Sequence, residues 1–495
     1  MKKTSRDSFN YCITIFRIII YLILALTFFS CKDEPTAPVE PGTSESIIIL
    51  YTNDEHGWME PEGTYGGAAG LMGLWREKEG YSEEKSNYLI LSGGDMWTGP
   101  AIATWFQGES MVAVMNKMNY TAAAIGNHEF DFKIEELKKR MEESNFPFLS
   151  TNIREKSSGQ IPEFISPYII EEIDGIKVGI IGLTTTSTPY TTFPDFVKEY
   201  NFINYAQALE EIVPHVKSEG ADILIAMGHI CLQEMQALVS TASQLGISVI
   251  TGGHCTQLVA SITNDVALIQ GGNRLENYAK LVIEYNPTTK AVTKLTPSYH
   301  DNIGGSPDGD VQAVVDFWRT QTDNALSEVI GYASTTIERY SVEMWNMVID
   351  SWFYTFPYAD ATMTNAGGLR QSIHAGDISM STIVGLLPFT NSIIQLELNG
   401  GQIINCIEKD IIVGGMTTIG GYKFSDGTAI EENTNYTVMT IDYLYSRDDY
   451  KFHLYDPNPY TTSSHYRQPL IDWIRSLNTS VSDPLNNYLD STPRR

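Results

Sequence analysis

The chain has 495 residues and a formal net charge of −27. This length predicts more than one domain, and a composition with 42% hydrophobic and 19% charged residues argues against a disordered chain. A protein this acidic repels phosphate backbones, so we expect no nucleic-acid binding. An anionic small substrate would need metal ions or local arginines to hold it.

The first 45 residues predict export and attachment to a membrane. Basic residues precede an apolar run at 18–30, which is too short for a spanning helix, and Cys31 follows. This pattern resembles a bacterial lipoprotein signal, which implies cleavage after residue 30, lipidation of Cys31 and anchoring to the outer membrane. An uncleaved anchor starting near Tyr11 is the alternative. Residues 31–45 predict an extended tether, and its first residues, Lys-Asp-Glu after the cysteine, resemble a signal for surface display.

Six short apolar runs follow, and each stops at Gly, Asp, Asn or His. They lie at 44–54, 87–99, 120–131, 175–185, 221–230 and 247–255. Continuous apolar runs are typical of strands that are buried on both faces. Helical patterns at 133–144 and 205–220 lie between them. We therefore predict an α/β domain with polar residues at the carboxyl ends of its strands, where such sheets bind ligands.

The segment 309–331 predicts one amphipathic helix, which would join this domain to a second α/β region. The predicted boundaries are 46–305 for the first domain, 306–330 for the linker helix and 331–495 for the second domain. Three cysteines lie in these domains, at positions 231, 255 and 406. Because they are an odd set, we predict no disulfide framework and interpret them as small apolar fillers.

Polar residues at the ends of the predicted strands suggest a metal centre. The available ligands are Asp54, His56, Asp95, Asn127, His229 and His254. Oxygen and imidazole ligands together suit Zn or Mn, and six of them suit a pair of ions bridged by one carboxylate. Two divalent ions about 3.5–4 Å apart can activate water and clamp an in-line phosphoryl displacement. Each motif alone could be an ordinary turn, but their recurrence at five strand ends favours a dinuclear site.

The motifs also resemble those of a known family. "ILYTNDEHG", "LSGGDMWTGP", "AIGNHEFDF", "IAMGHI" and "ITGGHC" occur in this order and resemble the calcineurin-like metallophosphoesterases of the 5′-nucleotidase family. The resemblance covers about residues 46–480. It implies a four-layer α/β/β/α metallophosphoesterase sandwich, followed by a smaller α/β substrate-binding domain.

The resemblance also implies roles for the residues in these motifs. The implied ligands are Asp54, His56 and a bridging Asp95 for the first metal, and Asn127, His229 and His254 with Asp95 for the second. His128 would not be a ligand and would stabilise charge on the phosphoryl group in the transition state. Asp131, three residues on, would hold the imidazole and favour its cationic form.

The motif "GHCTQ" departs from the family's usual Gly-His-x-His. The ligand position two residues after His254 holds Thr256, whose neutral hydroxyl is a poor ligand. We predict that Gln257 completes the first metal site. Thr256 and Cys255 remain as alternatives.

The second region resembles the family's C-terminal substrate domain. The implied substrate-binding residues are Asn365, Gly367, Gly368, Arg370, Phe389, Asn391 and Tyr450. Arg370 would bind phosphate or ribose through its forked donors, and Phe389 and Tyr450 would stack on the base. The alternatives are a structural ion pair for Arg370, a core position for Phe389 and a surface loop for Tyr450. Glu343 stands where many relatives carry an Arg, so one substrate-binding cation is expected to be missing.

We therefore expect a lipid-anchored, exported enzyme that binds nucleotides. Two Zn or Mn ions would activate a hydroxide for in-line attack on extracellular 5′-nucleotides, releasing nucleoside and phosphate, and the helix at 309–330 would form part of a hinge. The same chemistry on a 2′,3′-cyclic nucleotide or a nucleotide sugar is one alternative. A non-catalytic surface nucleotide-binding protein is another, but pure binding has no need of a His128–Asp131 pair.

Overall fold

Two six-stranded sheets form the core of the N-terminal region. The computed structural model describes residues 45–407 and 410–495, so the predicted signal, Cys31 and the tether up to residue 44 lie outside the described residues. The first sheet has the order β14 (Val292–Asp301), β13 (Asn277–Tyr285), β1 (Glu45–Thr52), β2 (Tyr88–Ser92), β3 (Ala122–Ala124) and β4 (Phe148–Leu149). The second has the order β11 (Leu258–Thr263), β12 (Val266–Gly271), β10 (Val249–Thr251), β9 (Ile223–Gly228), β7 (Ile176–Leu183) and β6 (Tyr168–Ile173).

Parallel pairing brings the predicted motifs to one edge of each sheet. In the first sheet β1, β2, β3 and β4 are parallel neighbours. In the second, β7, β9, β10 and β12 are parallel neighbours. The edge pairs β1–β13, β13–β14, β6–β7 and β11–β12 are antiparallel. Since parallel strands end at the same edge, the polar residues that follow them converge.

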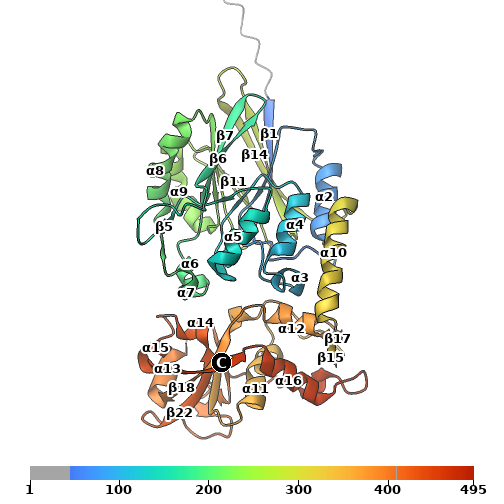
Figure 1. Ribbon diagram of the computed structural model, residues 1–495, viewed down its shortest axis with the longest axis vertical. Helices are drawn as coiled ribbons and strands as arrows, with labels where there is room; N and C mark the ends of the chain where they lie inside the picture. The colour runs from blue at the N-terminus through green and yellow to red at the C-terminus, as the bar shows by residue number, and fades with distance from the viewer. Residues whose placement is uncertain (1–44, 408–409) are drawn as a thin grey trace, which may run out of the picture. The chain divides into compact units, whose positions relative to one another are not determined.

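The two sheets pack face to face and helices cover their outer faces (Figure 1). In β1, Ile47 and Ile49 belong to the apolar cluster between the sheets, whereas Leu50 belongs to the cluster beneath the helices. The first sheet is covered by α2 (Gly67–Glu77), α4 (Glu109–Lys117) and α5 (Lys133–Glu143), and the second by α8 (Tyr205–Ser218) and α9 (Leu232–Leu245). Burial on both faces explains the continuous apolar runs, and the predicted α/β/β/α layering is confirmed.

The C-terminal region has a sheet and an apolar core of its own. Its five-stranded sheet has the order β19 (Ile411–Gly414), β16 (Ala361–Asn365), β22 (Asn435–Ile441), β18 (Ser392–Asn399) and β23 (Tyr460–His465). Its longer helices are α11 (Val342–Thr355), α12 (Met380–Leu386), α13 (Gly400–Cys406) and α16 (Gln468–Leu477). One buried cluster, running from Ile330 to Leu485, fills this region.

The helix predicted over 309–331 is shorter in the structure. It is α10 (Gly309–Leu326), and the Asp308 side chain caps it by accepting from the backbone N–H groups of Asp310 and Val311. The prediction was wrong at the C-terminal end, because the apolar residues after Glu328 form a strand, β15 (Val329–Ala333), that pairs with β17 (Gly376–Ser379). The helix packs on α2 and α4 and also contacts α12, so it touches both regions.

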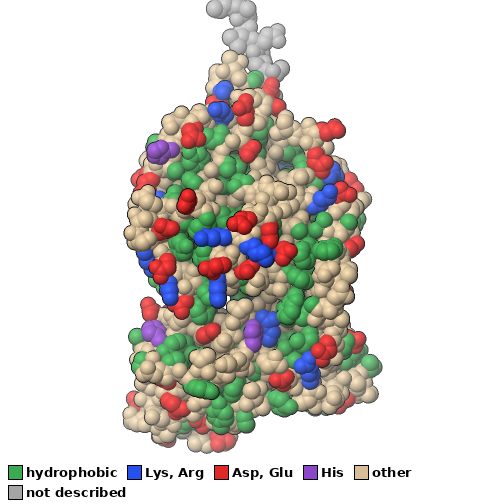
Figure 2. Space-filling model, in the orientation of Figure 1, with side chains coloured by type: hydrophobic (Ala, Val, Ile, Leu, Met, Phe, Trp, Pro, Cys, Tyr) green, Lys and Arg blue, Asp and Glu red, His purple; other side chains and the backbone are tan. Residues whose placement is uncertain are grey.

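The remaining elements are short. They are α3 (Ala101–Thr104), η1 (His128–Phe130), β5 (Ile153–Glu155), α6 (Thr188–Thr191), α7 (Pro194–Val197), β8 (Tyr200–Phe202), η2 (Ala366–Gly368), β20 (Met416–Thr417), β21 (Lys423–Phe424), α14 (Asp442–Tyr445), α15 (Phe452–Tyr455) and η3 (Leu485–Tyr488). Among the described residues, no helix has the length and apolar character needed to cross a membrane. On the face drawn in Figure 2, the described Lys and Arg side chains lie among Asp and Glu side chains rather than in one basic patch.

Candidate active site

The predicted ligands follow the strand ends in turns with unusual backbone geometry. Asp54, His56, Asp95 and His254 all have positive φ angles, of 51°, 46°, 59° and 67°. Non-glycine residues adopt this left-handed conformation rarely, at about 1–3 kcal/mol each, and such strain clusters at functional sites. These turns aim side chains from both sheets into one space.

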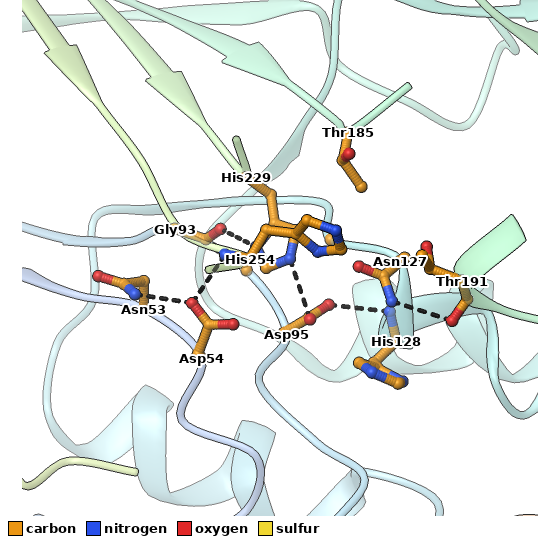
Figure 3. Close-up of polar contacts among 12 residues, drawn as sticks. Asn53, Asp54, Gly93, Asp95, Asn127, His128, Thr185, Thr191, His229 and His254 are labelled. Atoms are coloured by element: carbon orange, nitrogen blue, oxygen red, sulfur yellow. Dashed lines mark hydrogen bonds and ion pairs between the residues drawn. The ribbon is translucent and has the colours of Figure 1, made fainter. Parts of the chain in front are cut away.

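Asp95 is the centre of this space (Figure 3). Its Oδ2 lies 2.9 Å from His229 Nε2, and its Oδ1 accepts from the backbone N–H of His128 at 2.8 Å. Ligand atoms of Asp95, His229 and His254 lie within 4.8 Å of one another, and the same holds for His56, Asp95 and His128. Because both clusters share Asp95, one carboxylate can serve two adjacent ions.

His229 directs its Nε2 at the Asp95 carboxylate. Its Nδ1 lies 2.8 Å from the carbonyl oxygen of Gly93, which can only accept, so Nδ1 carries a proton. Nε2 lies 2.9 Å from Asp95 Oδ2, so these two atoms share a proton when the imidazole is cationic and can share a metal ion when it is neutral. Burial alone would lower the pKa of His229, but the charge of Asp95 outweighs it and raises the pKa to about 10.

Asn127 and Asp54 also have oxygen atoms that a bound metal ion would satisfy. The Asn127 amide nitrogen donates to the carbonyl of Thr191 at 3.2 Å, while its Oδ1 is buried without a hydrogen-bond partner. Burial, together with the nearby charge of Asp95, raises the pKa of Asp54 to about 6. An orphaned buried oxygen and two crowded carboxylates are what a divalent ion would satisfy, so the donor set fits Zn or Mn.

His128 has the partner that the sequence predicts. Its Nδ1 lies 2.7 Å from Asp131 Oδ2, and Thr192 donates its hydroxyl to the other oxygen of that carboxylate at 2.9 Å. Burial alone would lower the pKa of His128, but the charges of Asp131 and Asp95 outweigh it and raise the pKa. The imidazole is therefore oriented and biased towards the cationic form.

Glu129 is a buried acid that sequence reasoning missed. Its carboxylate accepts from the backbone N–H groups of Asp95, Met96 and Gly126 at 2.6–2.8 Å. Burial and the charge of Asp95 raise the pKa of Glu129 to about 8. The side chain ties the turn after β2 to the turn after β3 and so fixes the position of Asp95. The role of Glu129 depends on the distance in space between these two turns, and the sequence alone does not give that distance.

One cavity of about 450 Å³ joins this cluster to the C-terminal region. The predicted substrate residues in its lining are Asn365, Gly367, Gly368, Arg370, Phe389 and Asn391. The Phe389 ring stacks on the His128 ring, with 5.9 Å between centroids, and the Arg370 guanidinium lies 5.8 Å from the Phe389 centroid. Arg370 Nη2 also lies 3.2 Å from His56 Nε2. The C-terminal side chains thus meet the metal cluster directly.

Tyr450, which was predicted to stack on the base, lies outside the cavity lining. Its side chain is buried, its hydroxyl donates to the Asp410 carboxylate at 2.8 Å, and it is not part of the cavity lining. Tyr443 and Arg447 line the cavity instead. The Arg447 guanidinium lies 5.3 Å from the Tyr443 centroid and 4.9 Å from the Tyr450 centroid, between the two rings. The segment 442–452 therefore reaches the cavity, but through Tyr443 rather than through the predicted Tyr450.

Besides Arg447, three cavity arginines face aromatic rings. Arg274 lies over Trp58 at 4.6 Å, Arg339 over Tyr340 at 4.5 Å and Arg370 over Phe389 at 5.8 Å. Among the described residues, no carboxylate forms an ion pair with any of the three. Glu343 does not line the cavity, whereas Arg339 does, and the missing substrate-binding cation stays a prediction. Burial and the nearby charge of Arg370 lower the pKa of Arg339 to about 10.

The turn after His254 corrects the prediction for the cysteines. Cys231 and Cys255 form a disulfide, so two of the three domain cysteines are not apolar fillers and Cys255 is not a free ligand. An odd number of cysteines still allows one pair, and the ends of adjacent parallel strands bring these two together. Thr256 lines the cavity, whereas Gln257 is exposed and outside the lining.

The fold and the Asp95-centred clusters define a metallophosphoesterase. Residues 47–255 match the calcineurin-like phosphoesterase family, and residues 322–423 match the 5′-nucleotidase C-terminal domain. The chain belongs to the 5′-nucleotidase family, which joins these two domains, and it is a hydrolase by that membership.

Individual relatives agree with this assignment. A 5′-nucleotidase of Vibrio parahaemolyticus is 25% identical over 93% of this chain and 92% of its own length. "Endonuclease YhcR" of Bacillus subtilis is 25% identical over 91% of this chain, which spans only 41% of that longer protein. The crystal structure of a 5′-nucleotidase precursor from Thermus thermophilus superposes with a TM-score of 0.73 at 19% identity, covering 88% of this chain and 97% of the other.

Proposed function

We propose that this protein hydrolyses the phosphomonoester of 5′-nucleotides to nucleoside and phosphate, with the help of two divalent ions. The observation that carries the proposal is the single cavity that contains both the Asp95-centred clusters and the side chains of Arg370 and Phe389. One substrate can then place its phosphate at the metals while its base reaches an aromatic ring. The nucleotidase relatives support the same substrate class.

The proposed ligands are those that the sequence indicates. Asp54, His56 and Asp95 would hold one ion, and Asn127, His229 and His254 with Asp95 would hold the other. Bound ions would supply Lewis-acid polarisation of the phosphoryl oxygens and an activated water. For the last position of the first site, Thr256 is the side chain that lines the cavity, and Gln257 would have to turn inward from its exposed position.

The chain's own residues would orient and neutralise the substrate. His128, oriented by Asp131, would donate a hydrogen bond to the phosphoryl group as charge develops on it. Arg370 would contact the phosphate or ribose with its guanidinium. Asn391 donates to Asp442 at 2.9 Å, which leaves its amide oxygen available for the nucleoside.

Tyr443, rather than Tyr450, is proposed to stack on the base with Phe389. We expect Tyr443→Ala to raise KM for 5′-AMP about tenfold, because losing one base–aromatic stack costs about 1–3 kcal/mol. Steady-state kinetics would measure this. The matched control is Tyr445→Ala on the same short helix, whose side chain is outside the cavity lining and which should change KM little. An unchanged KM for Tyr443→Ala would contradict base stacking by Tyr443.

A nucleotide sugar or another substrate with a second anionic group is a second candidate. The three cavity arginines without carboxylate partners, Arg274, Arg339 and Arg370, favour it, because one phosphate at two metal ions needs few further cations. Chromatographic measurement of the products formed from 5′-AMP, 5′-ADP and a uridine diphosphate sugar, compared by kcat/KM, separates the two. A preference for the diphosphate compounds would favour the second candidate.

Export and lipid anchoring at Cys31 remain part of the proposal. The Cys231–Cys255 disulfide supports export, because disulfides persist in oxidising compartments such as the periplasm and the cell surface. One relative is described as "Cell wall protein Lmo0130" of Listeria monocytogenes.

The domain boundaries at 305 and 330 also remain part of the proposal, as does a hinge role for α10. The separate apolar cores of the two regions support them.

A further inference from the structure

The Cys231–Cys255 disulfide lies beside two of the proposed metal ligands. Cys231 follows His229 by two residues, at the start of α9, and Cys255 directly follows His254. The Cα atoms of the two cysteines are 5.2 Å apart, and 24 residues separate them in sequence. The crosslink therefore joins the turn after β9 to the turn after β10, and each turn carries a ligand.

The two turns differ in how firmly the rest of the fold holds them. His229 is fully buried, its Nδ1 contacts the Gly93 carbonyl, and its backbone N–H donates to Leu183 at 2.8 Å. The turn after His254 is half-buried to exposed through residue 258, and both His254 and Thr256 have positive φ angles. His229 is thus fixed by the sheets, whereas His254 lies in a strained, exposed turn.

Non-covalent contacts hold the His254 turn mainly at its two ends, where the Tyr51 hydroxyl donates to the Gly252 carbonyl at 2.8 Å and the Gly272 N–H donates to the Gln257 carbonyl at 3.2 Å. The backbone N–H of Gly253 donates to the Ile230 carbonyl at 3.0 Å, and that of His254 donates to Asp54 Oδ2 at 2.9 Å. Asp54 is itself a proposed ligand, so a bound ion would compete for the oxygen that steadies this turn. The His254 ring contacts the Ser187 hydroxyl at 3.2 Å. The disulfide is the covalent link between this turn and the well-fixed end of β9.

We propose that Cys231 and Cys255 are positioning residues for the second metal site: their disulfide holds His254 in its ligating position and thereby sets the affinity for that ion. The inference rests on the proposed dinuclear site. A dithiol reductant would remove the constraint by exchange. Its two thiols become one disulfide, and the Cys231 and Cys255 sulfurs take up two electrons and two protons to become thiols. Both cysteines are at least partly exposed, so a reductant has access.

The test is a metal titration of the double variant Cys231→Ser, Cys255→Ser. Calorimetric titration of metal-free protein, residues 32–495, with Mn²⁺ should show one of two ions bound about 10–100-fold more weakly, as expected when a group that orients a ligand is lost. At saturating Mn²⁺, kcat should return to within about threefold of the unmodified protein, since neither cysteine lines the cavity. The matched control is Cys406→Ala, in the C-terminal core, which should leave both affinities unchanged.

A second measurement guards against a variant that fails to fold. The unmodified protein, reduced with a phosphine after folding and freed of reductant without oxygen, should show the same weakened binding. Equal affinities in the oxidised, reduced and double-variant forms would overturn the proposal. Loss of the folded state in both reduced and variant proteins before metal is added would also overturn it, because the disulfide would then support the whole fold. The titration needs no substrate, so normal metal binding without hydrolysis of 5′-AMP would refute the proposed function alone.

Discussion

Replacing Asp95 with asparagine is expected to reduce kcat/KM for 5′-AMP at least about a thousandfold and to remove at least one of two bound ions. Asparagine keeps the shape and an oxygen that can accept from the His128 backbone N–H, but it removes the negative charge that both clusters share. A bound metal contributes several kcal/mol of transition-state stabilisation, and about 1.4 kcal/mol corresponds to a factor of ten in rate. Steady-state kinetics and elemental analysis of the purified variant measure the two effects.

A matched control for Asp95 lies on an exposed turn of the same region. Asp265→Asn, between β11 and β12, makes the same chemical change at a positive φ angle of 63° that asparagine tolerates. It should retain full activity and two ions per chain. If Asp95→Asn keeps two ions and wild-type activity, Asp95 does not bridge the site and the dinuclear assignment fails.

Replacing His128 with alanine is expected to lower kcat about 100- to 1,000-fold while the protein keeps both ions. This is the range measured when one preorganised donor to a developing oxyanion is removed. The Asp131 carboxylate at 2.7 Å orients the imidazole for this purpose. His215→Ala, at an exposed position on α8, provides the matched control and should behave like the unmodified protein.

The metal content of His128→Ala separates two roles for this residue. Ligand atoms of His128, His56 and Asp95 lie within 4.8 Å of one another, so the geometry also allows His128 to be a ligand. Loss of an ion in His128→Ala would assign it to the metal site. Retained ions with unchanged kcat would show that it has neither role.

The sequence was most informative where local pattern and topology coincide. Continuous apolar runs ending in polar residues predicted β1, β2 and β3 of the first sheet and β7, β9 and β10 of the second, because burial on both faces removes the alternation of a half-exposed strand. Parallel pairing brings Asp54 and Asp95 to neighbouring strand ends of the first sheet, and the packing of the two sheets brings His229 of the second sheet to Asp95. Local pattern therefore indicated an α/β domain with polar strand ends, whereas the four-layer sandwich was predicted from the resemblance to the family.

The sequence was least informative where a role depends on distance in space. Tyr443 and Tyr450 lie on the same short segment, and only the fold shows that one lines the cavity and the other bonds Asp410. Only the fold shows that Arg339 lines the cavity and that Glu343 does not. The Cys231–Cys255 disulfide depends on adjacent strand ends, which a count of cysteines does not reveal.

The most direct test is phosphate release from 5′-AMP by residues 32–495, with added Mn²⁺ or Zn²⁺ and with a metal-stripped control. The proposed function predicts release that requires metal, is lost with the stripped protein and returns when metal is restored. Such a result would also show that the "GHCTQ" motif supports catalysis with Thr256 in the cavity. No release from protein that demonstrably binds two ions would contradict the account and leave a different phosphoester, or binding without turnover, as the function.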